Sequence, residues 1–151
     1  MRRPPQYHVG AKIVLHCGHG LAMQLRDNIP GIACPGFLTF FGGGIETGET
    51  LAGAAARELE EETGLRFTHA LGLLSCVGYY NEGPRAVAGL YYYSQQVRCT
   101  DLHVTEGTLV CVSAPSELDD YPILEPVKVI ATHYLQQLAC ASTVPVPGVV
   151  T

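Results

Sequence analysis

Residues 42–65 read GGGIETGETLAGAAARELEEETGL, which is three glycines followed by an alanine-rich and acidic segment. Thr50 is of a residue type that caps the start of a helix, and Gly64 is of the type that ends one. The alanines between them favour helix, so the sequence predicts a helix over Thr50–Thr63. One stripe of this helix is expected to face the core, and it consists of Ala52, Ala55, Ala56 and Leu59.

Carboxylates crowd another face of this predicted helix. Six of the 14 acidic residues of the chain lie between Glu46 and Glu62. At about 100° per residue, Glu58, Glu61 and Glu62 fall within about 100° of arc. Like charges at this spacing repel each other, and a hard divalent cation, which prefers carboxylate oxygens, removes the repulsion. By itself, such a face is more often a solvated acidic surface with no ligand.

The glycines that precede the helix favour a ligand. They follow Phe37–Phe41, a short apolar run that predicts a strand, and we expect them to end that strand. Glycine lets the backbone turn tightly and lets a carbonyl or amide approach a ligand closely. A backbone oxygen from this loop could therefore complete a cation shell that begins with the helix glutamates.

This stretch resembles the signature of the Nudix hydrolases, Gly-x5-Glu-x7-Arg-Glu-U-x-Glu-Glu-x-Gly-U, where U is a bulky aliphatic residue. Nine constrained positions make a far more specific pattern than a lone glycine motif. All of them are filled at the correct spacing, by Gly43, Glu49, Arg57, Glu58, Leu59, Glu61, Glu62, Gly64 and Leu65. The resemblance covers most of residues 7–140 and implies an α+β fold, an α/β/α sandwich around a mixed β-sheet.

The resemblance also implies a metal site. By position, Glu58, Glu61 and Glu62 look like ligands of Mg²⁺ or Mn²⁺, and the carbonyl of Gly42 occupies the place of the family's backbone ligand. In some members one of these glutamates also activates water. The implied reaction is hydrolysis of a diphosphate bond in a small nucleotide-like substrate, such as a nucleoside triphosphate, a nucleotide sugar or ADP-ribose.

Two further catalytic roles follow by position. Arg57 resembles the arginine that orients the catalytic glutamate, and Glu49 resembles its partner at the start of the helix. The general base could be a glutamate of the signature or a residue from a nearby loop. Outside the signature, Glu106 is the candidate, and a surface acid without a role is the competing interpretation.

The signature identifies the bond that is cleaved and leaves the attached group open. Arg26 and Arg85 could contact a phosphate, although an ordinary surface role is equally consistent with the sequence. Tyr92, in a predicted strand, could stack on a base, and Phe40 could line a pocket near the glycine loop. Packing is the competing interpretation for both aromatic residues.

The rest of the chain is expected to complete one domain, residues 1–151. Predicted strands, loops and helices follow the hydrophobic pattern and the positions of glycine and proline. The predicted strands are His8–Leu15, Leu21–Arg26, Thr68–Tyr80, Ala86–Val97 and Leu109–Val112, and a hairpin joins the first two. Residues 28–36 are expected to form a loop and residues 142–151 a tail. Ser116–Leu118 is expected to form one helical turn. A second helix is expected over Pro126–Ala139, with one face packed on the sheet through Val127, Ile130, Ala131, Tyr134, Leu135 and Leu138.

Composition limits the partners. The net charge of −5 argues against broad binding to nucleic acid, which needs a basic face. No apolar run reaches the roughly 18 residues of a membrane helix, and a signal-type segment is not apparent, so a cytoplasmic enzyme is expected. A non-catalytic nucleotide sensor and an RNA-processing or decapping hydrolase remain as alternatives, and the family admits a homodimer.

The cysteines do not indicate a metal or redox motif. Six are scattered along the chain and none forms a Cys-x-x-Cys pair. The sequence favours reduced core residues for four of them, namely Cys76, Cys99, Cys111 and Cys140. His16–Gly20, with Cys17 between two histidines, is interpreted as a polar hairpin turn.

Overall fold

The computed structural model describes residues 8–32, 34–66, 72–79, 86–92 and 97–141. Within these ranges, residues 8–9, 72–79, 86–92 and 141 are described by their backbone alone. The predicted tail, Arg85, residues 68–71 and 80 of one long predicted strand and residues 93–96 of the other lie outside the described residues.

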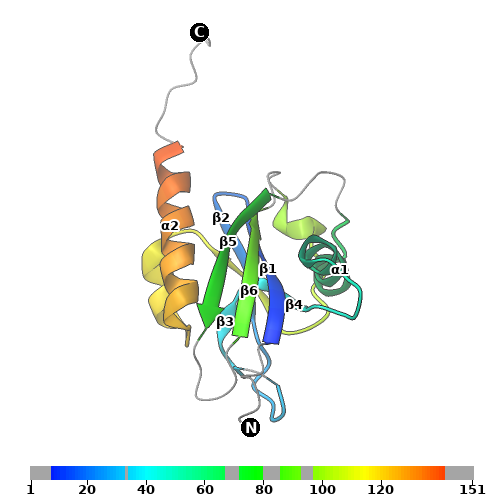
Figure 1. Cartoon of the computed structure of the whole chain (residues 1–151). Helices are drawn as coiled ribbons and strands as arrows, with labels where there is room; N and C mark the ends of the chain where they lie inside the picture. The colour runs from blue at the N-terminus through cyan, green and yellow to red at the C-terminus, as the bar shows by residue number, and fades with distance from the viewer. Residues whose placement is uncertain (1–7, 33, 67–71, 80–85, 93–96, 142–151) are drawn as a thin grey trace, which may run out of the picture.

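A mixed β-sheet forms the centre of the molecule (Figure 1). Its strands run in the order β3-β2-β1-β6-β5, with β4 paired to β1 and β7 paired to β2. Strand β1 is parallel to β6, and the other pairs are antiparallel. The strands are β1 (His8–Cys17), β2 (Gly20–Leu25), β3 (Leu38–Thr39), β4 (Phe41–Gly44), β5 (Gly72–Tyr79), β6 (Ala86–Tyr92) and β7 (Thr108–Val112).

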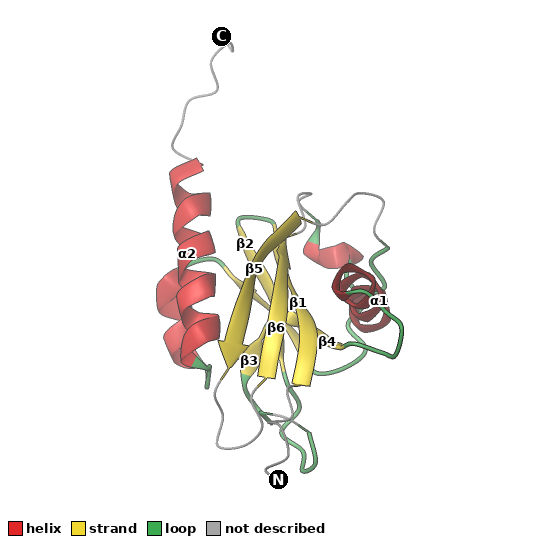
Figure 2. Ribbon diagram, in the orientation of Figure 1, coloured by secondary structure: helices red, strands yellow, loops and turns green. Residues whose placement is uncertain are grey.

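Helices cover both faces of the sheet, with α1 (Leu51–Thr63) on one side and α2 (Glu125–Ala141) on the other (Figure 2). Two short 3-10 helices, η1 (Cys99–Asp101) and η2 (Pro115–Asp120), flank β7 in the chain. This arrangement confirms the predicted α+β sandwich. Among the described residues, no helix is long and apolar enough to cross a membrane.

Alternation along β1 creates two hydrophobic cores, because successive side chains of a strand point to opposite faces. Ile13 and Leu15 pack in the core beneath α1, whereas Val14 packs in the core beneath α2. The predicted face of α2 is confirmed. Its Val127, Ala131 and Leu135 are buried in the second core, and Ile130, Tyr134 and Leu138 pack against them.

Local capping sets the ends of α1. The Thr50 hydroxyl accepts a hydrogen bond from the Gly53 amide at 3.0 Å, and Gly64 takes the left-handed conformation with φ 73°. The predicted core-facing stripe of α1 is right for Ala55 and Leu59 but wrong for its other two residues. Ala52 is exposed and Ala56 half-buried, whereas the buried apolar residues are Ala54, Ala55 and Leu59.

We expected the three glycines to end a strand, but the structure places them inside strand β4. Phe40 separates β3 from β4, and β4 continues through Gly44 as a partner of β1. Gly42 has φ 134°, a region open to glycine, and a Cβ there would collide with the Ala11 carbonyl. The absence of side chains thus permits the close approach of β4 to β1.

The prediction that the cysteines are reduced core residues is wrong for those whose side chains are described. Cys99 forms a disulfide with Cys17, because the chain brings the end of β1 next to η1. Cys111 and Cys140 are exposed, and the side chain of Cys76 lies outside the described set.

Candidate functional site

Glu62 of α1 bonds directly to the glycine strand. The Gly42 amide donates to its Oε2 at 2.9 Å, and the residue is only 6% exposed. Burial raises the pKa of Glu62, while the Gly42 hydrogen bond and the charge of Lys12 oppose that rise. A carboxylate is therefore fixed beside the strand in an environment that favours charge neutralisation.

Glu58 lies against the next glycine. A Cβ built on Gly43 would be 2.6 Å from the Glu58 carboxyl carbon and from its Oε1. The absence of a side chain at Gly43 therefore makes the space that this carboxylate occupies.

Arg57 ties the carboxylates of the helix together. Its Nη1 donates to Glu58 Oε1 at 2.9 Å and to Glu61 Oε2 at 3.2 Å. Its Nε and Nη2 hold Glu49 at 2.8 and 3.0 Å, and Nη2 also reaches the Gly44 carbonyl at 3.0 Å. The hydrogen bond to Arg57 is the main reason that the pKa of Glu49 is lowered. Arg57 uses its planar donors to hold several acceptors in one geometry.

Lys12 of β1 supplies a second positive charge next to the glycine strand. Its Nζ donates to the carbonyls of Gly42 at 3.3 Å and Phe40 at 3.4 Å. Burial lowers the pKa of Lys12; nearby Glu62 opposes that effect and Arg26 adds to it. Sequence reasoning missed this residue. The available signal was one lysine inside the apolar strand His8–Leu15.

The three glutamates gather on one side of the glycine strand, but they are held by two different donor residues. Glu58 and Glu61 bond to Arg57, and Glu62 bonds to the Gly42 amide. In the described part of the chain, the only group of three His, Cys, Asp or Glu ligand atoms that all lie within 4.8 Å of one another consists of cysteines. The carboxylates thus share a face without meeting at a single point.

An open pocket of about 300 Å³ has charged residues in its wall that interact electrostatically with this site, although Glu58, Glu61 and Glu62 do not line it. Its lining includes Gln24, Arg26 and Glu106. Among the described residues, the buried Nε of Arg26 has no acceptor and the buried Oε1 of Gln24 has no donor. The charges of Arg26 and Glu62 both act on Lys12, and that of Glu106 acts on Glu62. The Thr105 amide, one residue before Glu106, donates to the Glu62 carbonyl at 3.1 Å, so the main chain links the pocket wall to α1.

The remaining predicted substrate residues have different outcomes. Phe40 is fully buried in the core beneath α2, so the prediction that it lines a pocket is wrong. The physical reason is the alternation at the β3–β4 junction, which points its ring toward α2. The side chain of Tyr92 and the whole of Arg85 lie outside what the structure describes.

Comparison with known proteins gives a family match. The family model of the NUDIX domain matches residues 6–130. No curated protein matches the chain.

Several solved structures share the fold at low sequence identity. The MutT protein from Methanosarcina mazei Go1 has a TM-score of 0.70 and 16% identity, covering 95% of this chain and 100% of that chain. The NUDIX domain of Shewanella oneidensis NrtR, solved with ADP ribose, has a TM-score of 0.67 and 17% identity, covering 88% and 89%. A bifunctional NMN adenylyltransferase/ADP ribose pyrophosphatase from Francisella tularensis, solved with AMP and a manganese ion, has a TM-score of 0.64 and 21% identity, covering 91% and 43%.

Proposed function

Because the chain belongs to the Nudix family of hydrolases, we propose that it hydrolyses the diphosphate bond of a small nucleotide-like substrate with the help of Mg²⁺ or Mn²⁺. The observation that carries this proposal is the packing of Glu58 and Glu62 against Gly43 and Gly42, with Arg57 joining Glu58 to Glu61. Water attacks one phosphorus, the anhydride P–O bond breaks, and two phosphate products and a proton leave.

The donor set fits a hard divalent cation. Glu58, Glu61 and Glu62 offer carboxylate oxygens, and Gly42 offers a carbonyl, which are the ligands that Mg²⁺ and Mn²⁺ prefer. The Gly42 oxygen also accepts a hydrogen bond from the Lys12 ammonium, which competes with the ion for this oxygen. When bound, the ion would offset charge on the phosphate oxygens and lower the pKa of water near phosphorus.

The chain's own residues supply positioning. Arg57 holds Glu58 and Glu61 at fixed distances, so both carboxylates keep their direction when substrate enters. Glu49 accepts two of the Arg57 donors and fixes the guanidinium in turn. We assign Glu106, in the wall of the pocket, as the candidate general base outside the signature.

The pocket provides the substrate subsite. The Arg26 Nε is a buried donor without an acceptor among the described residues, and it matches a phosphate oxygen. The Gln24 Oε1 is a buried acceptor that matches an N–H or O–H of the attached group. Together they favour a substrate that carries a polar group next to its diphosphate, such as ADP-ribose, a nucleotide sugar or a nucleoside triphosphate.

A substrate panel with a matched pair of variants tests the proposal. Nucleoside triphosphates, nucleotide sugars and ADP-ribose are incubated with the protein and Mg²⁺ or Mn²⁺, with metal omitted as a control, and released phosphate or monophosphate is measured. Glu61→Gln should lower turnover by about 100-fold or more, the size typical of losing one charged group that acts on the transition state. Glu61→Gln and the wild type should have the same circular dichroism spectrum.

Glu60→Gln is the matched control. Glu60 is on the same helix, but it is exposed and paired with Arg66 at 2.8 Å. This variant should retain wild-type turnover. Binding of the panel without turnover in the wild-type protein would support the nucleotide-sensor alternative, and equal turnover of the two variants would contradict the metal assignment.

A further inference from the structure

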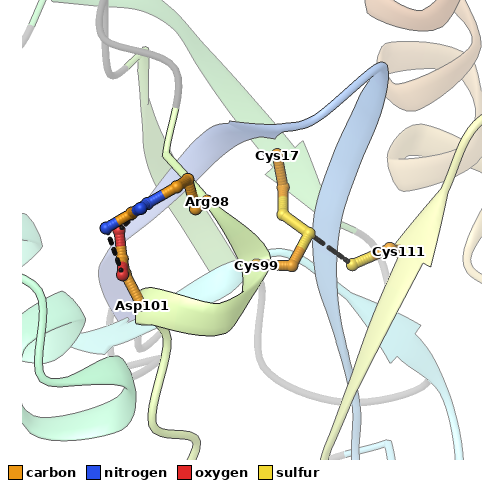
Figure 3. The surroundings of a disulfide bond; sticks show 5 residues. All are labelled: Cys17, Arg98, Cys99, Asp101 and Cys111. Carbon is orange, nitrogen blue, oxygen red and sulfur yellow. Dashed lines mark hydrogen bonds and ion pairs between the residues drawn. A yellow bond between two sulfur atoms is a disulfide. The ribbon is translucent and has the colours of Figure 1, made fainter.

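Three cysteine sulfurs from separate segments meet outside the carboxylate cluster. Cys17 ends β1, Cys99 begins η1, and Cys111 lies in β7 (Figure 3). Cys17 and Cys99 form a disulfide across 82 residues of sequence. The Cys111 Sγ lies 2.9 Å from that of Cys99 and 3.8 Å from that of Cys17. The proposed hydrolysis uses none of these sulfurs.

Main-chain bonds hold these positions independently of the sulfur chemistry. The Val97 amide donates to the His16 carbonyl at 3.0 Å, and Val97 pairs with Cys17 in a β-bridge two residues before Cys99. Cys111 pairs with Ala22 in the β2–β7 ladder. The cluster is therefore built into the sheet, so opening the disulfide leaves the three side chains together.

The three sulfurs are close enough to form a thiolate site once the disulfide is opened, and the Cys17–Cys111 separation of 3.8 Å already matches one. The cluster's three ligand atoms all lie within 4.8 Å of one another, and among the described residues no fourth His, Cys, Asp or Glu joins the group. A Zn–S bond of about 2.3 Å in tetrahedral geometry separates sulfurs by about 3.8 Å. Cys17 is buried, Cys99 is half-buried and Cys111 is exposed, so the cluster opens to solvent on one side.

We propose that, in the reduced protein, Cys17, Cys99 and Cys111 bind one soft, thiophilic cation of the Zn²⁺ type, with a fourth position open to solvent. Thiolates select such cations over Mg²⁺ and Mn²⁺, so the site is chemically distinct from the glutamates.

The Cys17–Cys99 disulfide is the oxidised form of the same cluster. Two electrons and two protons from a thiol reductant, which is itself oxidised to a disulfide, open it to two thiols. Binding of the cation by three thiols then releases three protons.

Occupancy would also anchor the segment that follows η1. Its His103 and Thr105 amides donate to the carbonyls of Thr63 and Glu62 at 2.8 and 3.1 Å. A cation that ties Cys99 to β1 and β7 would therefore stabilise the start of the segment that packs on the end of α1.

Cd²⁺ titration of the reduced full chain tests the proposal, because thiolate ligation gives an ultraviolet charge-transfer band. Excess Mg²⁺ keeps hard-cation sites occupied. We expect one Cd²⁺ per chain, and Cys111→Ser should weaken binding by roughly 100-fold or more, since even changes outside the ligand shell can cost that much. Disulfide-bonded wild-type protein should show no band.

Cys140→Ser is the matched control, because Cys140 is an exposed cysteine on α2. It should bind Cd²⁺ as the wild type does. Zn²⁺ should raise the thermal unfolding temperature of the reduced wild type and of Cys140→Ser, but not that of Cys111→Ser. An absent band in the reduced wild type, or the same affinity in both variants, would overturn the proposal.

Discussion

The Lys12 Nζ lies 3.3 Å from the carbonyl oxygen of Gly42, so an ammonium group contacts the oxygen that we propose as a ligand of the divalent cation. The strand register causes this contact, because Lys12 pairs with Gly42 in the β1–β4 ladder. The charge of Lys12 also acts on Glu62 and Glu58. Lys12 therefore offsets part of the negative charge of the site and competes for one of its ligands.

Lys12→Met should strengthen divalent cation binding. It removes one positive charge from the carboxylates, and we expect the Kd for Mn²⁺ to fall by roughly tenfold, equivalent to about 1.4 kcal/mol. Calorimetric titration with Mn²⁺ measures this. Lys128→Met is the control, because Lys128 is on α2 and pairs with Asp119 at 2.6 Å. Equal Kd values in the two variants would contradict the role of Lys12.

Arg57→Lys should lower turnover by roughly 10- to 100-fold while metal still binds. Lysine keeps the charge but cannot hold Glu49, Glu58 and Glu61 with one rigid fork, and misplacing a catalytic carboxylate slows reaction by such factors. Steady-state kinetics should show the loss in kcat more than in KM. Arg66→Lys changes an exposed ion pair and should leave both parameters unchanged. A wild-type kcat in Arg57→Lys would count against the positioning role.

Gly43→Ala should reduce activity by about tenfold or more with a small change in stability. The new Cβ would overlap the Glu58 carboxylate, which is the flexible end of a side chain and can move away. Gly44→Ala is the neighbouring control, since a Cβ there meets nothing within 4 Å. Turnover and urea unfolding of both variants distinguish the two positions. The interpretation fails if the two alanine variants are equally active.

Stability should depend on pH through Glu62. Burial raises the pKa of Glu62 above its ordinary value of about 4.3, so the folded state holds its proton to higher pH than the unfolded state does. The contribution of this group to the free energy of unfolding therefore falls as pH rises above about 4, until pH passes the folded-state pKa.

Glu62→Gln removes that dependence. Without divalent cations, urea denaturation should show that the free energy of unfolding of this variant rises relative to that of the wild type as pH increases from about 4 to about 8. Glu60→Gln changes an exposed carboxylate and should show no such gain. Parallel pH profiles for wild type and Glu62→Gln would refute the prediction.

Features set by neighbouring residues could be predicted from the sequence. The ends of α1 follow from Thr50 and Gly64, which act within one turn of the helix. The spacing of Arg57 and Glu61 likewise allows their contact, because residues four apart on a helix are neighbours. The fold class followed from the same local signature.

Features that depend on distant pairing could not be predicted in this way. The sequence suggests that three consecutive glycines interrupt a strand. They form part of β4 only because they pair with β1, which is distant in the sequence. Lys12 reaches Gly42 across 30 residues, and Cys17 reaches Cys99 across 82. Phe40 was misassigned because the junction of β3 and β4 decides which face its ring joins.

The tight seating of Gly42 on β1 has an evolutionary consequence. Any larger residue would collide with the Ala11 carbonyl, so the requirement to fold preserves Gly42 even in a descendant that has lost all turnover. Glu61 has no such protection, because its side chain is 60% exposed and the core does not need it. When relatives of this chain are compared, the loss of Glu61 therefore indicates a protein that has lost its catalytic activity. The presence of Gly42 indicates only that the sheet is intact.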